Sequence, residues 1–191
     1  PHTHVRNPEA SWGSPLLIEA IRDVAATVRT AYPGGEKVVV GDMSRRNGGR
    51  FRPHYTHQQG RDIDLRYFLT GGTLGDYAYR PVTHLNFDKA RNLALLEALQ
   101  KTPAVDRILM DYRHQRLLWN YALEQGRSKA ALSTLFSYPR GRSVGSALVH
   151  HARGHWNHVH IRIRRGQAQR IGRRWSRTKA LKMQIKYNRF L

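Results

Sequence analysis

The strictest pattern in the chain is the alternation of polar and apolar residues over 157–164, which is typical of a β-strand. The polar face consists of His158, His160, Arg162 and Arg164, and the apolar face of Val159, Ile161 and Ile163. Such alternation predicts a half-buried strand. Its two histidines point the same way, and its aliphatic side chains anchor it in a core.

A second polar cluster lies between residues 57 and 65. Asp62 and Asp64 alternate with two aliphatic residues, which predicts another half-buried strand with both carboxylates on its polar face. Gly60 lets the backbone turn between His57 and this strand. The two strands therefore offer carboxylates and imidazoles, and the loop before the second one offers another imidazole.

These residue types are suited to a metal site. Imidazole nitrogens and carboxylate oxygens are the natural zinc ligands in a chain without cysteine. A catalytic zinc ion needs three protein ligands and an open position for water. The two clusters contain more histidines and carboxylates than this, so some of the histidines are not needed as ligands. A spare imidazole can act as a general base, because its ordinary pKa lies near neutrality. The alternative is a cluster of packing histidines, since five of the 11 fall within residues 150–160.

The chain has the length and composition of one folded domain, with 191 residues of which 40% are hydrophobic. Periodicity and end signals predict helices at 14–31, 87–101, 113–124 and 128–137, and strands at 37–40, 105–110, 145–150 and 157–164. From residue 166 onward the chain is very basic and has no long periodic apolar face. We expect a domain over residues 1–165 and a basic C-terminal extension over 166–191.

The net charge is the most unusual bulk property, because 33 Lys and Arg residues against 13 Asp and Glu give +20. Such a surface attracts polyanions, and both nucleic acid and an anionic cell envelope fit it. The absence of cysteine excludes disulfides, iron–sulfur clusters and thiol nucleophiles. No apolar run reaches the roughly 18 residues of a membrane-spanning helix, and the first 14 residues show no signal peptide.

Longer motifs around these clusters resemble a family of peptidases. The resemblance rests on Val40-Gly-Asp-Met-Ser44, Gly48-Gly49, His54-x-x-His57-Gln-x-Gly60-Arg-Asp-Ile-Asp64, Asn86-Phe-Asp88-x-x-Arg91-Asn92 with Leu95-Leu96, and Gly154-His155-x-x-His158-x-His160-Ile-Arg162. Over roughly residues 5–163 the chain resembles the penicillin-insensitive murein endopeptidases. That family belongs to the superfamily of lysostaphin-type peptidases, D-Ala-D-Ala metallopeptidases and the amino-terminal domain of hedgehog proteins.

The resemblance implies that a zinc ion (Zn2+) is held by His57, Asp64 and His160. It implies that His155 and His158 are catalytic histidines that do not bind the metal. It also implies an α+β fold in which a central antiparallel sheet carries the zinc ligands, with flanking helices and long loops. The family cleaves peptidoglycan cross-links between D-Ala and meso-diaminopimelate. We therefore expect a zinc metallopeptidase of the murein DD-endopeptidase type, working in the periplasm or after secretion.

The two catalytic histidines have different expected roles. We expect His158 to take the proton of the attacking water, because its strand places it beside His160. His155 would then stabilise the oxyanion. Asp62 is expected either to orient a ligand histidine or to be a solvated carboxylate beside Arg61.

Expectations for the surrounding residues are less specific. Asp42 and Ser44 lie on a glycine-rich loop, where they could line the cleft or stabilise the loop. We expect His54 to form part of the cleft wall rather than to bind the metal, and Trp156 to be exposed at the cleft edge. Interior packing is expected of three other aromatic residues: Tyr55, Trp119 and Trp175.

Two features depart from the family pattern. Relatives often carry cysteines, whereas this chain has none, and the basic extension is not part of the resemblance. The charge makes a basic nucleic-acid-binding protein or a metal-dependent nuclease the alternative function, and a non-catalytic zinc-bearing binding module is the third. We expect peptidoglycan as the substrate and an anionic cell-wall or envelope surface as a partner, with no dedicated nucleic acid.

Overall fold

The structure, a computed structural model, describes residues 2–71, 75, 77–143, 145–165 and 188–189. The strands are β1 (Thr3–Val5), β2 (Trp12–Gly13), β3 (Val38–Val40), β4 (Asp62–Arg66), β5 (Val105–Met110), β6 (Val149–His151), β7 (His158–Ile163) and β8 (Asn188–Arg189). The helices are η1 (a 3-10 turn, Pro8–Ala10), α1 (Pro15–Ala31), α2 (Lys89–Gln100), α3 (Tyr112–Glu124) and α4 (Lys129–Leu135). The expected α+β class is confirmed. Within the described ranges, every helix is too short or too polar to cross a membrane.

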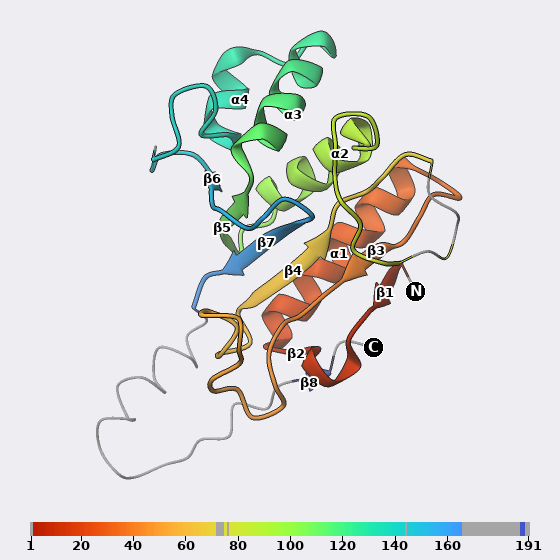
Figure 1. Cartoon of the computed structure of the whole chain (residues 1–191), viewed down its shortest axis with the longest axis vertical. Helices are drawn as coiled ribbons and strands as arrows, with labels where there is room; N and C mark the ends of the chain where they lie inside the picture. Colours follow the sequence, from red (N-terminus) through yellow and green to blue (C-terminus); the bar gives the residue numbers. More distant parts are fainter. Residues whose placement is uncertain (1, 72–74, 76, 144, 166–187, 190–191) are drawn as a thin grey trace.

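Six strands form one mixed sheet in the order β1-β3-β4-β7-β5-β6 (Figure 1). The four inner strands β3, β4, β7 and β5 run antiparallel to one another, as expected, whereas the outer strands β1 and β6 pair parallel with β3 and β5. The register between β4 and β7 sets Asp64 opposite His160 and Asp62 opposite Arg162. Directly opposed residues on antiparallel strands have Cβ atoms about 5 Å apart, so these side chains are within contact distance.

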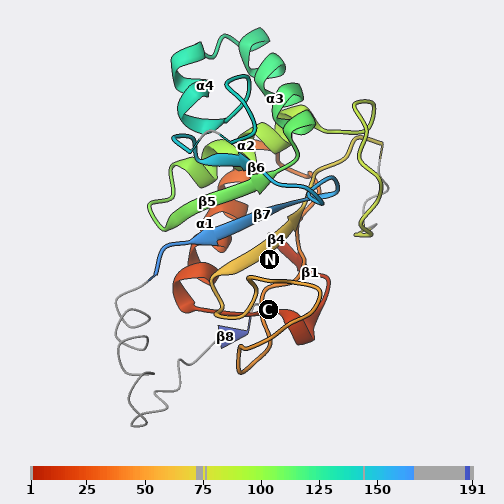
Figure 2. The ribbon, with the colours of Figure 1, turned by 60° about the vertical axis from the view of Figure 1, so that its left-hand side comes forward.

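One face of the sheet is covered by the core. Figures 1 and 2 show α1 running behind β3 and β4, with α3 and α4 beyond β5 and β6. The aliphatic side chains of β4 and β7 face this core and are fully buried: Ile63, Leu65, Val159, Ile161 and Ile163. Each contributes roughly 1.5–3 kcal/mol by burial. The opposite face of the same two strands is left to the histidines and aspartates, which confirms the predicted alternation.

The helix ends follow the signals in the sequence. Ser14 caps α1, because its hydroxyl accepts a hydrogen bond from the Leu17 amide at 3.3 Å, and Pro15 begins the helix. Asp88 caps α2 by accepting from the Arg91 amide at 2.9 Å. The four predicted helices are confirmed, with ends that differ by at most two residues.

The edge strands differ from the prediction. The strand expected at 145–150 is confined to Val149–His151, and β1 and β2 were not predicted. Strands of two or three residues are too short to show an alternating pattern. They form because hydrogen bonds to the backbone of a partner strand hold them in place. β8 pairs antiparallel with β2. The rest of the expected extension (166–187, 190 and 191), with Trp175, lies outside the described residues, so its boundary at residue 165 stays a prediction.

A buried histidine in α3 predicts pH-dependent stability. The ring of His114 lies 5.0 Å from those of Tyr67 and Phe87, and burial lowers its pKa to about 4. The unfolded histidine binds a proton near its usual pKa of 6.5, so stability falls as the pH drops through this window. The free energy of unfolding of wild type should decrease when the pH is lowered from 7 to 5. In His114→Phe this decrease should be smaller by about 1 to 2 kcal/mol. Urea unfolding at both pH values measures this, and equal losses would contradict it.

Candidate metal centre

The polar face of β4 and β7 brings together residues that lie far apart in the chain. Asp64 lies opposite His160, and His57 reaches the same place from the loop before β4. Gly60 makes the intervening turn with a φ of +60°, as predicted from its conformational freedom. The exposed fractions are 1% for His57 and 5% for both Asp64 and His160. Buried polar groups require partners, and these three side chains are partners of one another.

Three atoms of this group lie at the spacing of a tetrahedral zinc site. The Nε2 atom of His57 lies 3.1 Å from Nδ1 of His160 and 3.4 Å from Oδ1 of Asp64. The third distance, from His160 Nδ1 to Asp64 Oδ1, is 3.0 Å. Zinc binds nitrogen and oxygen at about 2.0–2.2 Å, so ligand atoms at tetrahedral angles lie roughly 3.3 Å apart. Two imidazoles and one carboxylate therefore fit a zinc ion in chemistry and in spacing.

Each of these imidazoles is oriented by a hydrogen bond from its other nitrogen. His57 Nδ1–H donates to the carbonyl of Met43 at 2.7 Å, and His160 Nε2–H donates to Oδ1 of Asp62 at 2.9 Å. Both acceptors lack a proton, so His57 Nε2 and His160 Nδ1 are the nitrogens able to offer a lone pair. Asp62 is only 2% exposed and also accepts from Arg162 Nε at 2.7 Å. Asp62 thus orients His160, and the alternative of a solvated carboxylate is wrong.

The charges of the group favour a cation at its centre. Burial lowers the pKa of His160, but the hydrogen bonds to Asp62 and Asp64 outweigh it and raise that pKa to about 9. Burial likewise opposes ionisation of Asp64, but the neighbouring imidazoles of His160 and His57 hold its pKa well below the usual value. Carboxylates that stabilise an imidazolium in this position would also stabilise a divalent metal ion.

His54 is a further imidazole close to the same carboxylate. Its Nδ1 lies 3.7 Å from Oδ2 of Asp64, and its Nε2 lies 2.9 Å from Oδ2 of Asp42. His54, His57 and Asp64 each place one ligand atom within 4.8 Å of the others, and this cluster could hold a metal ion. The hydrogen bond to Asp42 raises the pKa of His54 despite its partial burial. His54 therefore stands at the rim of the centre, next to the group formed with His160.

Two more histidines flank the cluster. The Nε2 atom of His158 lies 3.8 Å from Oδ1 of Asp64, and the rings of His155 and His158 lie 4.9 Å apart. His158 Nδ1–H donates to Oδ1 of Asn157 at 2.7 Å, and His155 Nδ1–H donates to the carbonyl of Arg153 at 3.0 Å. Burial lowers both pKa values, that of His158 to about 4. At pH 7 both imidazoles are therefore neutral and can accept a proton at Nε2.

Two tyrosines that support these histidines were not predicted. The hydroxyl of Tyr67 donates to the carbonyl of His155 at 3.1 Å. The ring of Tyr79 lies 6.1 Å from that of His158, and its hydroxyl occupies the space that a Cβ at Gly41 would need. Both tyrosines lie in irregular chain, where neither alternation nor helical spacing marks a contact.

The glycine-rich loop is stabilised by its own polar side chains. Asp42 accepts from Nδ2 of Asn7 at 2.9 Å, and the Ser44 hydroxyl donates to the carbonyl of Trp12 at 2.8 Å. These contacts join the loop to the N-terminal segment. They support the loop-stabilising interpretation of Ser44, whereas Asp42 also contacts the rim of the centre through His54.

The aromatic expectations are confirmed in part. Trp156 is 44% exposed and Trp119 is buried at 6%, as predicted. Tyr55 is 93% exposed, so the expectation that it packs in the interior is wrong. It lies between His54 and His57, and the short loop that turns both histidines toward Asp64 leaves the intervening side chain facing outward.

The fold and the site together define a class of protein. An α+β domain holds a buried histidine–carboxylate cluster that could bind a metal ion, beside neutral imidazoles able to transfer protons. A metal-binding cluster beside imidazoles that transfer protons is typical of hydrolases that use a metal ion. The family model of the penicillin-insensitive murein endopeptidases matches residues 3–125, and the chain belongs to this family. Comparison with curated proteins finds no match.

The matched segment covers only part of the site. It contains His57 and Asp64 but ends before His155, His158 and His160. The pairing of β7 with β4 places His160 opposite Asp64 and His158 opposite Arg66. The ring of His155 lies 4.9 Å from that of His158, so these contacts connect the three histidines with the matched segment.

Proposed function

We propose that the protein is a zinc-dependent endopeptidase that hydrolyses the cross-links between D-Ala and meso-diaminopimelate in bacterial peptidoglycan. Membership of the murein endopeptidase family supports the substrate class. The observation that carries the proposal is the convergence of two imidazole nitrogens and one carboxylate oxygen within 3.4 Å of one another. The choice of cross-link follows from the resemblance of the motifs.

We assign the metal to His57, Asp64 and His160 rather than to the set that contains His54. The separation from Asp64 is 3.0 Å for His160 but 3.7 Å for His54. Asp62 holds the far nitrogen of His160 and so aims Nδ1 at the cluster, as ligand histidines are commonly oriented. His54 is then a neighbour of the metal that keeps Asp42 in place.

The proton transfers are assigned to the flanking histidines. When bound, zinc supplies Lewis acidity, which polarises the scissile carbonyl and acidifies water. His158 accepts the water proton at Nε2, because that nitrogen is unprotonated and faces Asp64 at 3.8 Å. The imidazolium so formed protonates the leaving amine. His155 lies one ring further out. We assign it to stabilise the developing oxyanion, a role that requires the imidazolium form with a proton taken from solvent at Nε2, because Nδ1–H donates to the carbonyl of Arg153.

Asp62 should affect zinc affinity without touching the metal. In Asp62→Asn the charged acceptor of His160 Nε2–H is replaced by a neutral amide, so zinc affinity should fall about 10- to 100-fold. Competition with a chromophoric chelator measures this affinity. Asp23→Asn, an exposed carboxylate on α1, is the matched control and should bind zinc like wild type. Unchanged affinity in Asp62→Asn would contradict the orienting role.

One experiment separates the proposal from its rivals. Cross-linked muropeptides and plasmid DNA are incubated with the protein, with and without chelator, and the products are analysed by mass spectrometry and on gels. We expect new diaminopimelate amines and D-Ala carboxylates, lost with chelator and restored by zinc, and intact DNA. Cleaved DNA with intact muropeptides would support a nuclease. Wall binding without new amines would support a non-catalytic module.

The setting of the enzyme follows from its substrate and its charge. We place it in the periplasm or outside the cell, where peptidoglycan lies. Residues 166–191 contain eight Lys and Arg residues and no Asp or Glu, so we propose that this extension attracts the catalytic domain of residues 1–165 to anionic wall or envelope polymers. Weaker wall binding after removal of the extension, with unchanged cleavage of soluble muropeptides, is the expected result.

A further inference from the structure

The loop that joins β6 to β7 carries one of the two flanking histidines. It spans residues 152–157, and His155 lies within it. The loop leaves β6 with a hydrogen bond from the Ala152 amide to the carbonyl of Met110 at 3.2 Å. It then turns at Gly154, whose φ is +83°, before β7 begins. The two strands fix the ends of this loop, so the position of His155 depends on what holds the turn between them.

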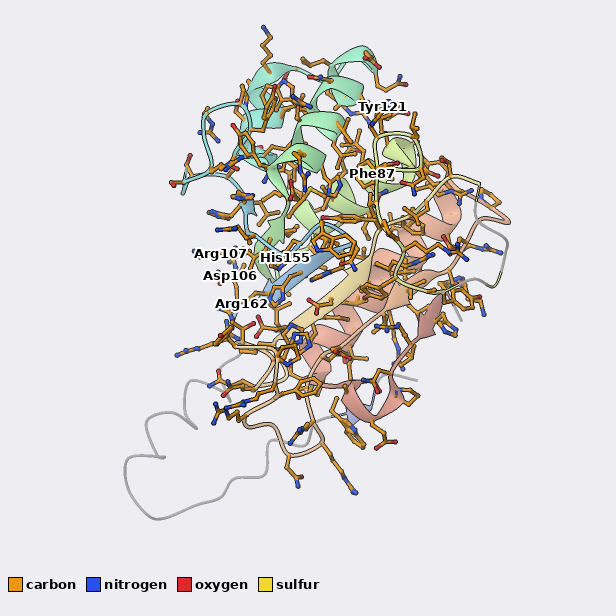
Figure 3. All side chains as sticks on the ribbon, viewed as in Figure 1. Phe87, Asp106, Arg107, Tyr121, His155 and Arg162 are labelled. Carbon is orange, nitrogen blue, oxygen red and sulfur yellow. The ribbon has the colours of Figure 1, made fainter. Side chains whose placement is uncertain are left out.

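The side chain of Tyr67 holds that turn. Its hydroxyl donates a hydrogen bond to the carbonyl of His155 at 3.1 Å. The ring lies 5.3 Å from that of Phe87 and 5.0 Å from that of His114, and Tyr67 is only 1% exposed. Phe87 and His155, which Tyr67 contacts through its ring and its hydroxyl, can be followed in Figure 3. Close packing around the ring fixes the place from which the hydroxyl meets the loop.

Tyr67 also belongs to the segment that carries a proposed metal ligand. It directly follows the end of β4, three residues after Asp64. Burial, and then the nearby charge of Asp111, raises the pKa of Tyr67 well above the usual value, so the hydroxyl keeps its proton and stays a donor near neutral pH. The hydrogen bond therefore joins the strand of the metal centre to the loop of His155, which lies far from it along the chain.

The orientation of the His155 ring depends on the position of its backbone. Its Nδ1–H donates to the carbonyl of Arg153 at 3.0 Å, which leaves Nε2 as the nitrogen able to contact a substrate. The ring centroid lies 4.9 Å from that of His158 and 5.9 Å from that of His160. A shift of the His155 backbone would move this nitrogen relative to the metal centre, and a displacement of about 1 Å in an active site can lower the rate about 100-fold.

We propose that Tyr67 is a positioning residue for His155. Its hydroxyl fixes the backbone of the loop, and the loop presents the imidazole of His155 beside the metal centre. A phenylalanine in place of Tyr67 would keep the packing of the ring and lose only the hydrogen bond, so the packing and the positioning role can be separated. The inference rests on the proposed function, because the role of His155 in turnover is part of that function.

Tyr67→Phe should lower turnover without loss of zinc. We expect kcat on a soluble muropeptide dimer to fall about tenfold, with KM and zinc content like those of wild type and a Tm lower by about 2–4 °C. Ser137→Ala is the matched control, because it removes another buried hydroxyl, which donates to Oε1 of Gln115 at 2.9 Å. The control should lower the Tm by a similar amount and keep the wild-type kcat. A wild-type kcat in Tyr67→Phe would overturn the positioning role.

A double-mutant cycle tests whether the effect passes through His155. In the background of His155→Ala, Tyr67→Phe should lower kcat by less than about twofold, because the imidazole that it positions is already absent. A further loss of about tenfold in that background would overturn the proposal and leave the proposed function intact.

Hydrogen exchange gives a readout that needs no turnover. Amide exchange over residues 152–157 should be about tenfold faster in Tyr67→Phe than in wild type or in Ser137→Ala. Unchanged exchange in Tyr67→Phe would overturn the positioning role. Failure of wild type to cleave any muropeptide would overturn the proposed function, and the exchange rates would then decide by themselves whether Tyr67 holds the loop.

Discussion

His160→Ala should lose its zinc and its murein endopeptidase activity together. The variant removes one of three ligand atoms that lie 3.0 to 3.4 Å apart, and it leaves Asp62 and Asp64 without the imidazole that both contact. Two remaining ligands hold zinc poorly, and loss of the metal removes several kcal/mol of transition-state stabilisation, so turnover should fall on the order of 10³-fold or more. Elemental analysis after dialysis and muropeptide digestion measure the two effects.

His54→Ala is the matched control, because it removes the other imidazole near Asp64. We expect it to retain about one zinc per chain, since the three proposed ligands remain in place. Circular dichroism and thermal unfolding verify that both variants fold. Zinc retained in His160→Ala but lost in His54→Ala would instead assign the metal to the cluster of His54, His57 and Asp64.

His158→Ala should show the opposite combination, with zinc retained and turnover lost. The Nε2 atom of His158 lies 3.8 Å from Oδ1 of Asp64, beside the proposed ligands. The other ring nitrogen, Nδ1, is hydrogen-bonded to Asn157. Removal of a general base lowers kcat by roughly 10²- to 10⁴-fold. Steady-state kinetics on a soluble muropeptide dimer, with metal content determined on the same preparation, give the result.

His155→Ala distinguishes the two flanking histidines. If His158 is the base, its loss should remove the acidic limb of the pH dependence of kcat, whereas His155→Ala should lower kcat and keep that limb. The fall in rate at low pH reports protonation of the base, since a protonated imidazole accepts no proton. The reverse assignment would follow if only His155→Ala abolished the limb. Zinc loss in His158→Ala would show that His158 is a ligand.

Much of the fold was predictable because the decisive signals are local. Ser14 and Pro15 begin α1 through a hydrogen bond and a fixed φ, neither of which needs a distant partner. The alternation of β7 is likewise local, and it assigns His158 and His160 to one face before any partner strand is known. The short strands β1, β2 and β8 form only through the backbones of their partners, so no local pattern marked them.

The residues of the site were predicted better than their contacts. Alternation indicated that Asp64 and His160 lie on polar faces, but only the register of β4 against β7 sets them opposite each other. That register depends on tertiary packing. For the same reason the sequence left two interpretations of Asp62 open, and its burial beneath His160 and Arg162 decides between them.

The loops around the site were the least predictable part. The exposure of Tyr55 results from the path of a loop that turns His54 and His57 inward, and aromatic character alone does not reveal that path. The packing of Tyr79 against Gly41 joins two irregular segments.

The central claim is tested most directly by anomalous diffraction at the zinc edge from crystals of the zinc-loaded protein. We predict a single strong peak on the polar face of β4 and β7, about 2.0–2.2 Å from His57 Nε2, Asp64 Oδ1 and His160 Nδ1. A peak bonded to His54 in place of His160 would contradict the ligand assignment. No peak at Asp64, in crystals grown from fully zinc-loaded protein, would contradict the metal centre itself.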